Sequence, residues 1–445
     1  MSLIGKSPQN LESPQKFVME VFGSILQTKW IDEAIQCVDR VDERIRKLPM
    51  RFVTWMLVGM GFHRNLSIQN VIARLGQLPG GIALWAKAPQ SAATGEARDR
   101  LGVAPIRLLF NRLSAWVLET QREALSWKGW LLLALDGTTV KVPDSSENRR
   151  VFGLPGTHRG NRAAFPQVRA LMLVSVTMHF ILDVLFAPYK IGELRLAPRM
   201  ASRLPPRSLL LLDRAFISWH FLWSLTQAGH AFVLRLRRGV KLQRYGRLSC
   251  GDWLVRAKVP RHVRRKAPTM PTFLEYREVT VRIGKTWFHF LTSLTDSAQY
   301  STEEIVGLYR QRWEAEIAID EFKTHQCTST TVNRPVIVRS KRPRRVIQEL
   351  YALVLVYNLI RCAMADAALC AKLAPLRVSF VDTLERLREG ALIMATANIL
   401  LLPEIYSQIL RAIARHPLPP RDGRKNRREV CIKMSSYPKK WKTPA

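Results

Sequence analysis

The chain has 445 residues, 47% of them hydrophobic, so it is long enough for two or three domains and too apolar for a disordered protein. Its 69 Lys and Arg residues outnumber its 35 Asp and Glu residues, which gives a formal net charge of +34. This excess favours nucleic acid as the partner over an anionic membrane surface, because the positive charge is spread along the whole chain.

Cysteine usage and hydropathy argue against secreted, zinc-binding and membrane classes. The six cysteines show no Cys-x-x-Cys pair and no histidines at zinc-finger spacing, which predicts reduced thiols. Residues Met1–Glu12 lack the apolar stretch of a signal peptide, and apolar runs such as Leu350–Tyr357 fall short of a membrane span of about 20 residues. We therefore expect a soluble, cytoplasmic protein without a membrane partner.

The N-terminal part, residues 15–125, is predicted to be helical. Apolar residues recur at spacings of three and four between Phe17 and Leu26, and again between Leu108 and Leu118. A further apolar segment spans Phe52–Ile72, and Ser67 can cap a helix that runs to about Leu75.

The pattern changes near residue 128, where short runs of branched and aromatic residues begin. Such runs predict strands at Trp130–Leu135, Ala170–Phe180, Ile181–Phe186, Ser208–Leu212 and Ala231–Leu236. Helices are predicted between these strands, at 192–203 and Phe216–Ala228. Strands that alternate with helices indicate an α/β protein with a mixed sheet covered on at least one face.

The remaining elements complete a five-part organisation. Residues 237–300 are basic, with strands at Leu274–Ile283 and Thr286–Leu294, and helices follow at 302–325, Val346–Leu369 and Ser379–Leu402, the last interrupted by Pro403. We predict a helical N-terminal domain (1–125), a core in two parts (126–236 and 301–375), a basic β-rich insertion (237–300) and a helical C-terminal region with a basic tail (376–445).

Two aspartates directly follow buried-type strands. Asp136 follows an apolar run that ends at Leu135, and Asp213 follows one that ends at Leu212. If the two strands are neighbours, both carboxylates meet at one edge of the sheet, where open sheets place their ligands. Alternatively, each Asp ends its strand as an Asx turn or helix cap. For either Asp alone the capping interpretation is favoured, and for the pair the two interpretations are equally supported.

A third carboxylate lies on the predicted helix Glu303–Thr324. At about 100° per residue, Tyr309, Arg312, Glu316 and Lys323 fall within roughly 60° of arc. In the structural interpretation, this stripe is a solvated face with an Arg312–Glu316 ion pair worth a few tenths of a kcal/mol. In the functional interpretation, Glu316 binds metal, Arg312 and Lys323 hold phosphates, and Tyr309 contacts the DNA backbone.

Three carboxylates in a basic protein suit phosphodiester chemistry. Two Mg²⁺ ions about 3.5–4 Å apart stabilise both the attacking and the leaving oxygen, and they activate water. Mg²⁺ prefers oxygen ligands and keeps several waters, so Asp136, Asp213 and Glu316 can hold the pair, and Mn²⁺ can substitute.

These motifs resemble one known family. The spacing Tyr309-x2-Arg312-x3-Glu316-x6-Lys323 resembles the signature helix of the insertion sequence 4 family of bacterial DDE transposases. Further similar stretches cover most of residues 40–330: Asp136-Gly137-Thr138 and Leu212-Asp213-Arg214-Ala215-Phe216 are similar to the family's first two catalytic blocks, and Arg46–Leu75 and Ala97–Gly102 to its N-terminal domain.

The resemblance implies a ribonuclease-H-like core, interrupted after its fifth strand by the β-rich insertion and flanked by all-α regions. It also implies cut-and-paste transposition by the Asp-Asp-Glu triad. Water nicks each transposon end, the freed 3′ hydroxyl attacks next, and the excised end is joined to target DNA. The partners would be double-stranded DNA, both element ends and target, with a homodimer in the synaptic complex. The N-terminal domain would bind the ends, and the protein would work at the bacterial nucleoid.

Secondary candidates each have a structural alternative. By family resemblance, Trp287 is a candidate to stack on a flipped base, although a packed strand residue is favoured. Arg214 either contacts phosphate or caps the following helix. His158 is interpreted as a solvated or DNA-facing loop residue, and Asp320 as a support for the site through pairing with Arg312 or Lys323.

Basic clusters surround the predicted site, and we expect them to follow DNA. They comprise Arg235, Arg237, Arg238, Lys241, Arg244 and Arg247; Arg256, Lys258, Arg261, Arg264, Arg265 and Lys266; Arg334, Arg339, Lys341, Arg342, Arg344 and Arg345; and, in the tail, Arg421–Arg428 with Lys439, Lys440 and Lys442. Two alternatives to an active transposase stay open: a non-catalytic repressor derived from one, and a nuclease of the same fold.

Overall fold

The computed structural model describes residues 22, 25–36, 48–76, 90–156, 165–249, 251–327 and 338–420. Several residues of the sequence analysis lie outside these ranges, namely Arg46, Lys47, His158, Arg334 and the basic tail.

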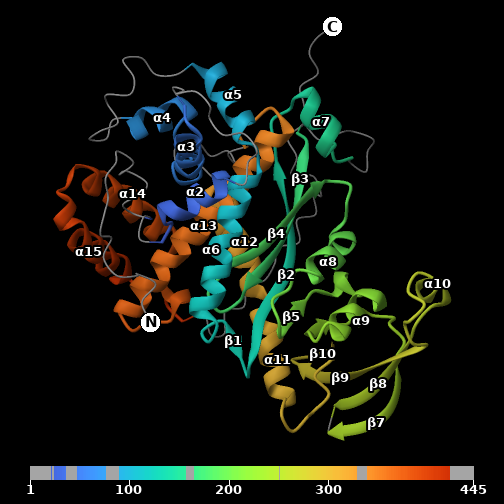
Figure 1. Ribbon diagram of the computed structural model, residues 1–445. Coiled ribbons are helices and arrows are strands. Elements are labelled where there is room, and N and C mark those ends of the chain that lie inside the picture. Colours follow the sequence, from blue (N-terminus) through green and yellow to red (C-terminus); the bar gives the residue numbers. More distant parts are fainter. Residues whose placement is uncertain are drawn as a thin grey trace.

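The described residues form one ten-stranded mixed sheet flanked by helices (Figure 1). Its central part has the order β4-β3-β2-β5-β6, in which β2, β5 and β6 are parallel and β3 is antiparallel to both of its neighbours. The bounds are β1 Ser126–Trp127, β2 Trp130–Lys141, β3 Gln167–Ser175, β4 Ile181–Pro188, β5 Ser208–Leu212 and β6 Ala231–Arg235. This order and these directions confirm the prediction of a mixed α/β sheet.

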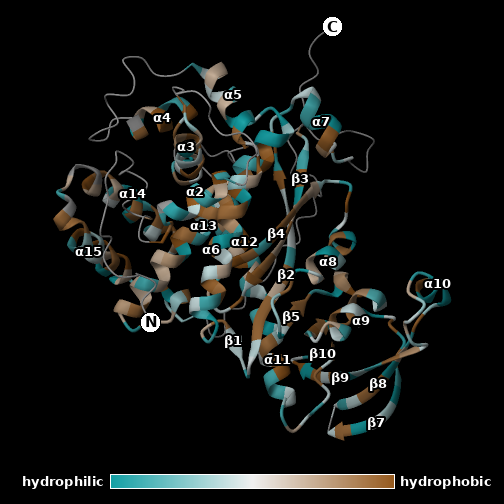
Figure 2. Ribbon diagram, viewed as in Figure 1, coloured by the Kyte–Doolittle hydropathy of each residue, from teal (hydrophilic) through white to brown (hydrophobic). Residues whose placement is uncertain are grey.

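The centre of the sheet is buried on both faces. All five residues of β5 are buried, as are Leu131–Leu135 of β2. Helices α8 (Glu193–Ala201) and α9 (Trp219–Gln227) lie on one side of the sheet in Figure 1. Helices α6 (Ala104–Gln121), α12 (Trp313–Asp320) and α13 (Pro343–Cys370) lie on the other. Continuous apolar runs are therefore the expected pattern for these strands, and Figure 2 shows them as brown segments in the interior.

Strand β2 is longer than predicted. The sequence pattern ends it at Leu135, but residues Asp136 to Lys141 continue to pair with β3, from Asp136↔Met172 to Lys141↔Gln167. Only its pairing with β5 stops at Leu135. The apolar run therefore marks only the part of β2 that is covered on both faces of the sheet, and the strand continues beyond it. Helix α7 (Ser146–Phe152), which follows β2, was also missed.

The basic insertion extends the core sheet. Its elements are β7 Gln243–Ser249, β8 Asp252–Lys258, α10 Arg261–Arg264, β9 Phe273–Ile283 and β10 Thr286–Thr292. Strand β10 pairs with β6, so β9, β8 and β7 continue outward in the same sheet. The buried Arg277 fixes this extension, because it pairs with Asp252 and donates to the carbonyl of Tyr300 at 2.6 Å.

Helices from both ends of the chain pack together on one side of the sheet. They are α2 Thr28–Gln36, α3 Met50–Phe62, α4 Ile68–Gly76, α5 Ser91–Leu101, α6 Ala104–Gln121, α13 Pro343–Cys370, α14 Phe380–Thr396 and α15 Leu402–Ala414. At Gly61 of α3 an added Cβ would lie 2.9 Å from the carbonyl oxygen of Ala352, so glycine permits the close approach of α3 to α13. Ser67 caps α4 as predicted, through the N–H of Asn70 at 3.1 Å.

Helix α13 is long and apolar enough to cross a membrane, and the bent pair α5–α6 meets the same criterion when it is taken together. The sequence predicts a helix here, at Val346–Leu369, although uninterrupted apolar runs such as Leu350–Tyr357 are shorter than a span. In α13, 89% of the apolar window is buried inside the protein, as in a core helix. Pro403 begins α15 and does not interrupt a helix, since α14 already ends at Thr396.

The predicted helix Glu303–Thr324 consists of three segments: α11 (Thr302–Gln311), α12 (Trp313–Asp320) and the π-helical η3 (Glu321–Gln326). A tightened turn separates the first two, because the N–H of Arg312 bonds to the carbonyl of Tyr309, three residues earlier. A uniform helical wheel therefore does not describe where its side chains point.

Candidate active site

The two aspartates lie side by side on adjacent strands. The last paired residues of the parallel strands β2 and β5 are Leu135 and Leu212, so Asp136 and Asp213 are the next residues on each strand. Neighbouring strands are about 4.8 Å apart, so the backbones of these two residues lie side by side at this edge of the sheet. Asp213 also accepts the N–H of Arg214 at 2.6 Å and caps the short helix η2 (Arg214–Phe216). For Asp213, the capping interpretation therefore describes the structure, and its register position beside Asp136 is compatible with convergence.

Arg312 joins the third carboxylate to the aspartates. Its Nη2 lies 2.7 Å from Oε1 of Glu316, and its Nη1 lies 3.8 Å from Oδ2 of Asp136. The side chain is only 9% exposed, so the stripe is not solvated at Arg312. The Arg312–Glu316 ion pair of the structural interpretation is present, and Lys323 is exposed. Burial lowers the pKa of Arg312, but its bond to Glu316 and the charges of Glu316 and Asp213 outweigh burial and raise it. The guanidinium of Arg312 thus lies within ion-pair distance of Asp136 on β2 and Glu316 on α12, and its pKa responds to the charge of Asp213, which follows β5.

Negative charge is in excess around Asp136. Burial raises the pKa of Asp136 to about 6, and the charges of Glu316 and Glu193 act in the same direction. The N–H of Gly137, at 2.8 Å, and Arg312 oppose this shift. A carboxyl group with so high a pKa gains from any additional cation nearby.

Lys323 and Tyr309 lie on either side of this centre. Lys323 donates to Oγ1 of Thr138 at 3.4 Å, so it contacts β2 two residues beyond Asp136. Desolvation, followed by the charge of Lys141, lowers the pKa of Lys323. The ring of Tyr309 packs on Phe290 of β10, with centroids 4.8 Å apart, and its burial raises its pKa.

Glu193 belongs to this neighbourhood and was not found from the sequence. It begins α8, accepts a hydrogen bond from Nη1 of Arg169 at 2.7 Å, and lies so close to Gly137 that an added Cβ there would overlap its carboxyl group. The only local signal was the glycine that follows Asp136, which leaves room for an approaching side chain.

The secondary candidates differ in their exposure and contacts. Trp287 is 58% exposed on β10, so the interpretation as a packed strand residue is wrong. The side chain of Arg214 is exposed. Asp320 accepts from the hydroxyl of Thr324 at 2.6 Å and lies 3.6 Å from His325, both in the adjoining segment η3. Its charge also acts on Lys323, whose pKa it raises against desolvation.

Arginines in and beside the insertion stack on aromatic rings. Arg235, at the end of β6, lies 4.6 Å from the ring centre of Phe288, and Arg256 lies 4.4 Å from that of Tyr245. Such stacking holds guanidinium groups in place at a surface, and Arg256 is also paired with Glu275 at 2.8 Å. Arg339, from the third basic cluster, instead donates to the last carbonyls of α3, including that of His63 at 3.2 Å.

Within the described ranges, no three His, Cys, Asp or Glu side chains are arranged to hold one metal ion as they stand. Arg312 occupies the position between Asp136 and Glu316. The donors there are carboxylate oxygens, the type that hard divalent cations such as Mg²⁺ prefer. These residues fit such a cation once the guanidinium turns away.

Comparison with known proteins assigns the chain to a family. Residues 127–359 match the model of the transposase DDE domain, and residues 17–111 match that of the insertion element 4 transposase N-terminal region. Transposase InsG for insertion sequence element IS4 of Escherichia coli K12 is 30% identical over 421 residues, which are 94% of this chain and 92% of the relative. Putative transposase InsZ of the same organism is 31% identical over 47% of this chain and 68% of its own length.

Among solved structures, the piggyBac transposase synaptic complex with hairpin DNA aligns with a TM-score of 0.42 and 11% identity, over 94% of this chain and 87% of that chain. The DDE-domain match covers more than half of the chain, and the relatedness to InsG extends over nearly all of it. The chain therefore belongs to the insertion sequence 4 family and is a DDE transposase.

Proposed function

We propose that Asp136, Asp213 and Glu316 are the catalytic, metal-binding carboxylates of this transposase. The observation that carries the proposal is the guanidinium of Arg312, shared by Glu316 at 2.7 Å and Asp136 at 3.8 Å. Asp213 supports it through its register position beside Asp136. Three carboxylates from separate elements around one positive charge have little structural value on a sheet edge, but together they suit cations.

Two Mg²⁺ ions, or Mn²⁺ in their place, would activate the attacking water or hydroxyl and stabilise the leaving oxygen. Arg312 then donates both arms of its guanidinium to the scissile phosphate, because a fork of this kind matches two phosphate oxygens. Lys323, held at Thr138 beside the aspartates, neutralises a second phosphate. Tyr309 supports the DNA backbone from the side of β10, where it packs on Phe290.

The proposed reaction is cut-and-paste transposition. In the first step, water forms a bond to the phosphorus at the element boundary, and the bond to the 3′ oxygen breaks to release a 3′ hydroxyl. In the last step, that hydroxyl forms a bond to a target phosphorus, and the target's own 3′ oxygen leaves. Each step is an in-line displacement, so one set of residues can serve them all.

The other parts are proposed to bind DNA in a cytoplasmic complex at the nucleoid. Residues 1–125 would recognise the element ends, and the insertion at 237–300, with its stacked arginines, would follow the duplex. Trp287, 58% exposed, is positioned to stack on an unpaired base, and the exposed Arg214 to contact phosphate. The core would comprise 126–236 and 301–375, followed by the region 376–445. Two copies would bring two ends together.

Cleavage of linear DNA that carries the ends of the encoding element tests this proposal. Wild type is compared in Mg²⁺ with Glu316→Gln, which keeps the size of the side chain, and with Glu303→Gln on the exposed start of α11 as the matched control. We expect boundary nicks and joined products from wild type and control, and a loss of roughly 100-fold or more from Glu316→Gln.

The other results would each reject part of the proposal. Binding without cleavage in Mg²⁺ or Mn²⁺ would indicate a repressor. Cleavage without joining would indicate a nuclease. Cleavage undiminished by Glu316→Gln would place the active site elsewhere.

A further inference from the structure

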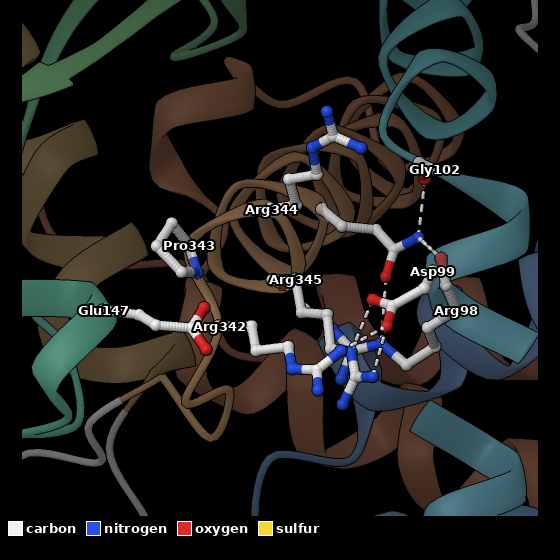
Figure 3. Close-up of a pocket in the computed structure, with 9 residues that line it drawn as sticks. Arg98, Asp99, Gly102, Glu147, Arg342, Pro343, Arg344 and Arg345 are labelled. Atoms are coloured by element: carbon white, nitrogen blue, oxygen red, sulfur yellow. Dashed lines mark hydrogen bonds and ion pairs between the residues drawn. The ribbon is translucent and has the colours of Figure 1, made fainter. Parts of the chain in front are cut away.

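A cavity of about 490 Å³ lies between α5, α7 and the start of α13, outside the carboxylate site (Figure 3). We term it the arginine cavity, and its charged lining comprises Arg98, Asp99, Glu147, Arg342, Arg344 and Arg345. Glu147 of α7 borders it on one side and Asp99 and Arg98 of α5 on the opposite side, with the arginines of α13 between them. Four guanidinium groups against two carboxylates leave it positively charged.

We propose that the arginine cavity binds backbone phosphates of the duplex DNA whose scissile bond lies at Asp136. The inference rests on the proposed function, which supplies the position of the DNA. Phosphate is the fitting ligand, because planar guanidinium forks match pairs of phosphate oxygens.

The arginines of the cavity have different tasks. Arg98 is buried and has a structural role, since it donates hydrogen bonds to Gln348 at 2.9 Å and to the carbonyl of Arg345 at 2.9 Å. Asp99 accepts from Arg342 at 2.9 Å and from Arg345 at 2.7 Å, which orients both groups without neutralising both.

Arg344 is the free cation of the cavity. It is exposed, forms no hydrogen bond or ion pair with another described residue, and points away from Asp99 in Figure 3. An exposed guanidinium without an acidic partner among the described residues can bind an anion without breaking an existing ion pair.

The first turn of α13 adds backbone donors. The helix begins after Arg342 without a side-chain cap, and Pro343 takes up its first position. The N–H groups of Arg344 and Arg345 therefore have no acceptor within the helix. A helix of 28 residues also directs its positive end at this point, which favours phosphate.

Positive residues connect the active site to the arginine cavity. From Asp136, strand β2 runs to Lys141 over roughly 17 Å, past Lys323 at Thr138. The loop that follows is fixed to the third basic cluster, because Ser145 donates to the carbonyl of Lys341 at 2.6 Å. At about 3.4 Å per base pair, a duplex that leaves the site would reach the cavity within roughly ten base pairs. This path favours bound DNA as the ligand over a free phosphate ion.

The test measures the salt dependence of DNA binding by the full-length protein. A labelled duplex spanning an element end and its flank is titrated without divalent metal, at a series of KCl concentrations, with wild type and with Arg342→Ala/Arg344→Ala. We expect Kd to rise roughly tenfold or more. The slope of log K against log [KCl] should become shallower by about 1.8, or 0.9 for each lost phosphate contact. An unrelated duplex should show the same changes, because phosphate contacts carry no sequence information.

Two variants keep the test specific. Arg411→Ala removes an exposed arginine on α15, away from the cavity in Figure 1, and should change neither quantity. Arg344→Lys should retain most of the slope, because it keeps the charge. Unaltered affinity and slope in a double variant with a normal unfolding transition would overturn the inference.

Truncated duplexes identify which DNA is bound. The duplex is shortened either on the element side or on the flank side. Only one of these truncations should abolish the difference in Kd and salt slope between wild type and the double variant. If neither truncation changes that difference, the result counts against the inference. Wild-type cleavage of the same duplex in Mg²⁺ tests the proposed function separately. A wild type that binds but does not cleave would reject that function while the salt comparison still stands.

Discussion

At the scale of single residues, Gly137 is constrained by a side chain far away in the sequence. A Cβ atom at this position would overlap the carboxyl group of Glu193, which is held by Arg169 at 2.7 Å. The backbone itself accepts other residues, since Gly137 lies within β2 and is not among the glycines with positive φ. The glycine therefore reserves space for Glu193 beside Asp136.

This explanation predicts that the effect of Gly137→Ala on the free energy of unfolding depends on whether Glu193 is present. In wild type, the added methyl group should displace Glu193 and lower the free energy of unfolding by about 1–3 kcal/mol. In a Glu193→Ala background, the same change should be neutral or slightly stabilising, because alanine suits a strand better than glycine. Urea denaturation of the four proteins completes the double-mutant cycle. An equal cost in both backgrounds would assign the constraint to the backbone instead.

At the scale of elements, a buried network holds the helical segments that carry Glu316. His179, in the turn between β3 and β4, bonds through Nε2 to Glu314 at 2.9 Å and through Nδ1 to Glu321 at 3.2 Å. Tyr357 of α13 donates to Glu321 at 2.8 Å, and Arg361 adds a charge at 3.4 Å. Burial favours the neutral form of Glu321, but Arg361 and His179 hold its pKa at about 2. The network thus holds the helical segments at Glu314 in α12 and at Glu321 in η3, before and after Glu316.

The network predicts that Glu321→Gln impairs cleavage more than DNA binding. Loss of the charge leaves the buried Arg361 uncompensated, which should lower the free energy of unfolding at pH 7 by about 3–5 kcal/mol. With Glu316 less firmly held, single-turnover nicking at saturating DNA should slow while Kd stays near wild type. The pKa of Glu321 is lowered on folding, so its stabilisation is complete above its unfolded pKa and is lost as pH falls toward 2.

Asp320→Asn is the matched control, because Asp320 is adjacent but exposed. Its effect on stability should stay within about 0.5 kcal/mol. An equal effect from both variants, or a Glu321→Gln protein that loses DNA binding instead of nicking, would contradict a positioning role.

The sequence predicted the elements that are buried on both faces. The apolar runs of β2, β5 and β6 were identified because central strands are apolar throughout. Strands β7 and β8 were missed, since β7 lies at the edge of the sheet and is largely exposed. An edge strand is defined by its hydrogen-bonded partner, which a local pattern of hydrophobicity does not reveal.

The candidate site was predictable to the extent that its residues follow local patterns. Asp136 and Asp213 were identified by the runs before them, but their adjacency depends on the register between strands far apart in sequence. The stripe on the Glu316 helix was identified from a regular period, whereas the turn at Arg312 and the π-helical segment were not. The position of Glu193 beside the site depends on tertiary packing alone, and Gly137 was the only local signal for it in the sequence.

At the scale of the whole molecule, buried ion pairs connect the N-terminal helices to α13. Glu349 is fully buried and bonds to Arg64 at 2.7 Å and to the N–H of Arg339. Arg339 in turn donates to the carbonyl of His63 at the end of α3. The regions that match the N-terminal and DDE family models therefore share a buried polar cluster, which contains several cations and few acids.

Acid stability is the property on which this cluster should act most directly. His63 is buried at the end of α3, and burial, followed by the charges of Arg74, Arg388 and Arg339, lowers its pKa to about 3. At pH values between about 3 and the unfolded pKa of about 6.5, His63 binds its proton more tightly in the unfolded chain than in the folded protein. His63 should therefore cost no stability above pH 6.5 and about 1.4 kcal/mol for each pH unit below it.

The wild-type curve alone would hide this effect. Burial raises the pKa of Asp136 and of Asp183 to about 6, so both groups contribute stability below their unfolded pKa that is lost as pH rises to 6. Comparison with His63→Gln removes these shared contributions. We expect the stability advantage of wild type over the variant to shrink by about 2 kcal/mol between pH 6.5 and 5, as measured by urea denaturation. A difference that stays constant over this range would mean that His63 is not held neutral, and that the basic cluster is screened from it.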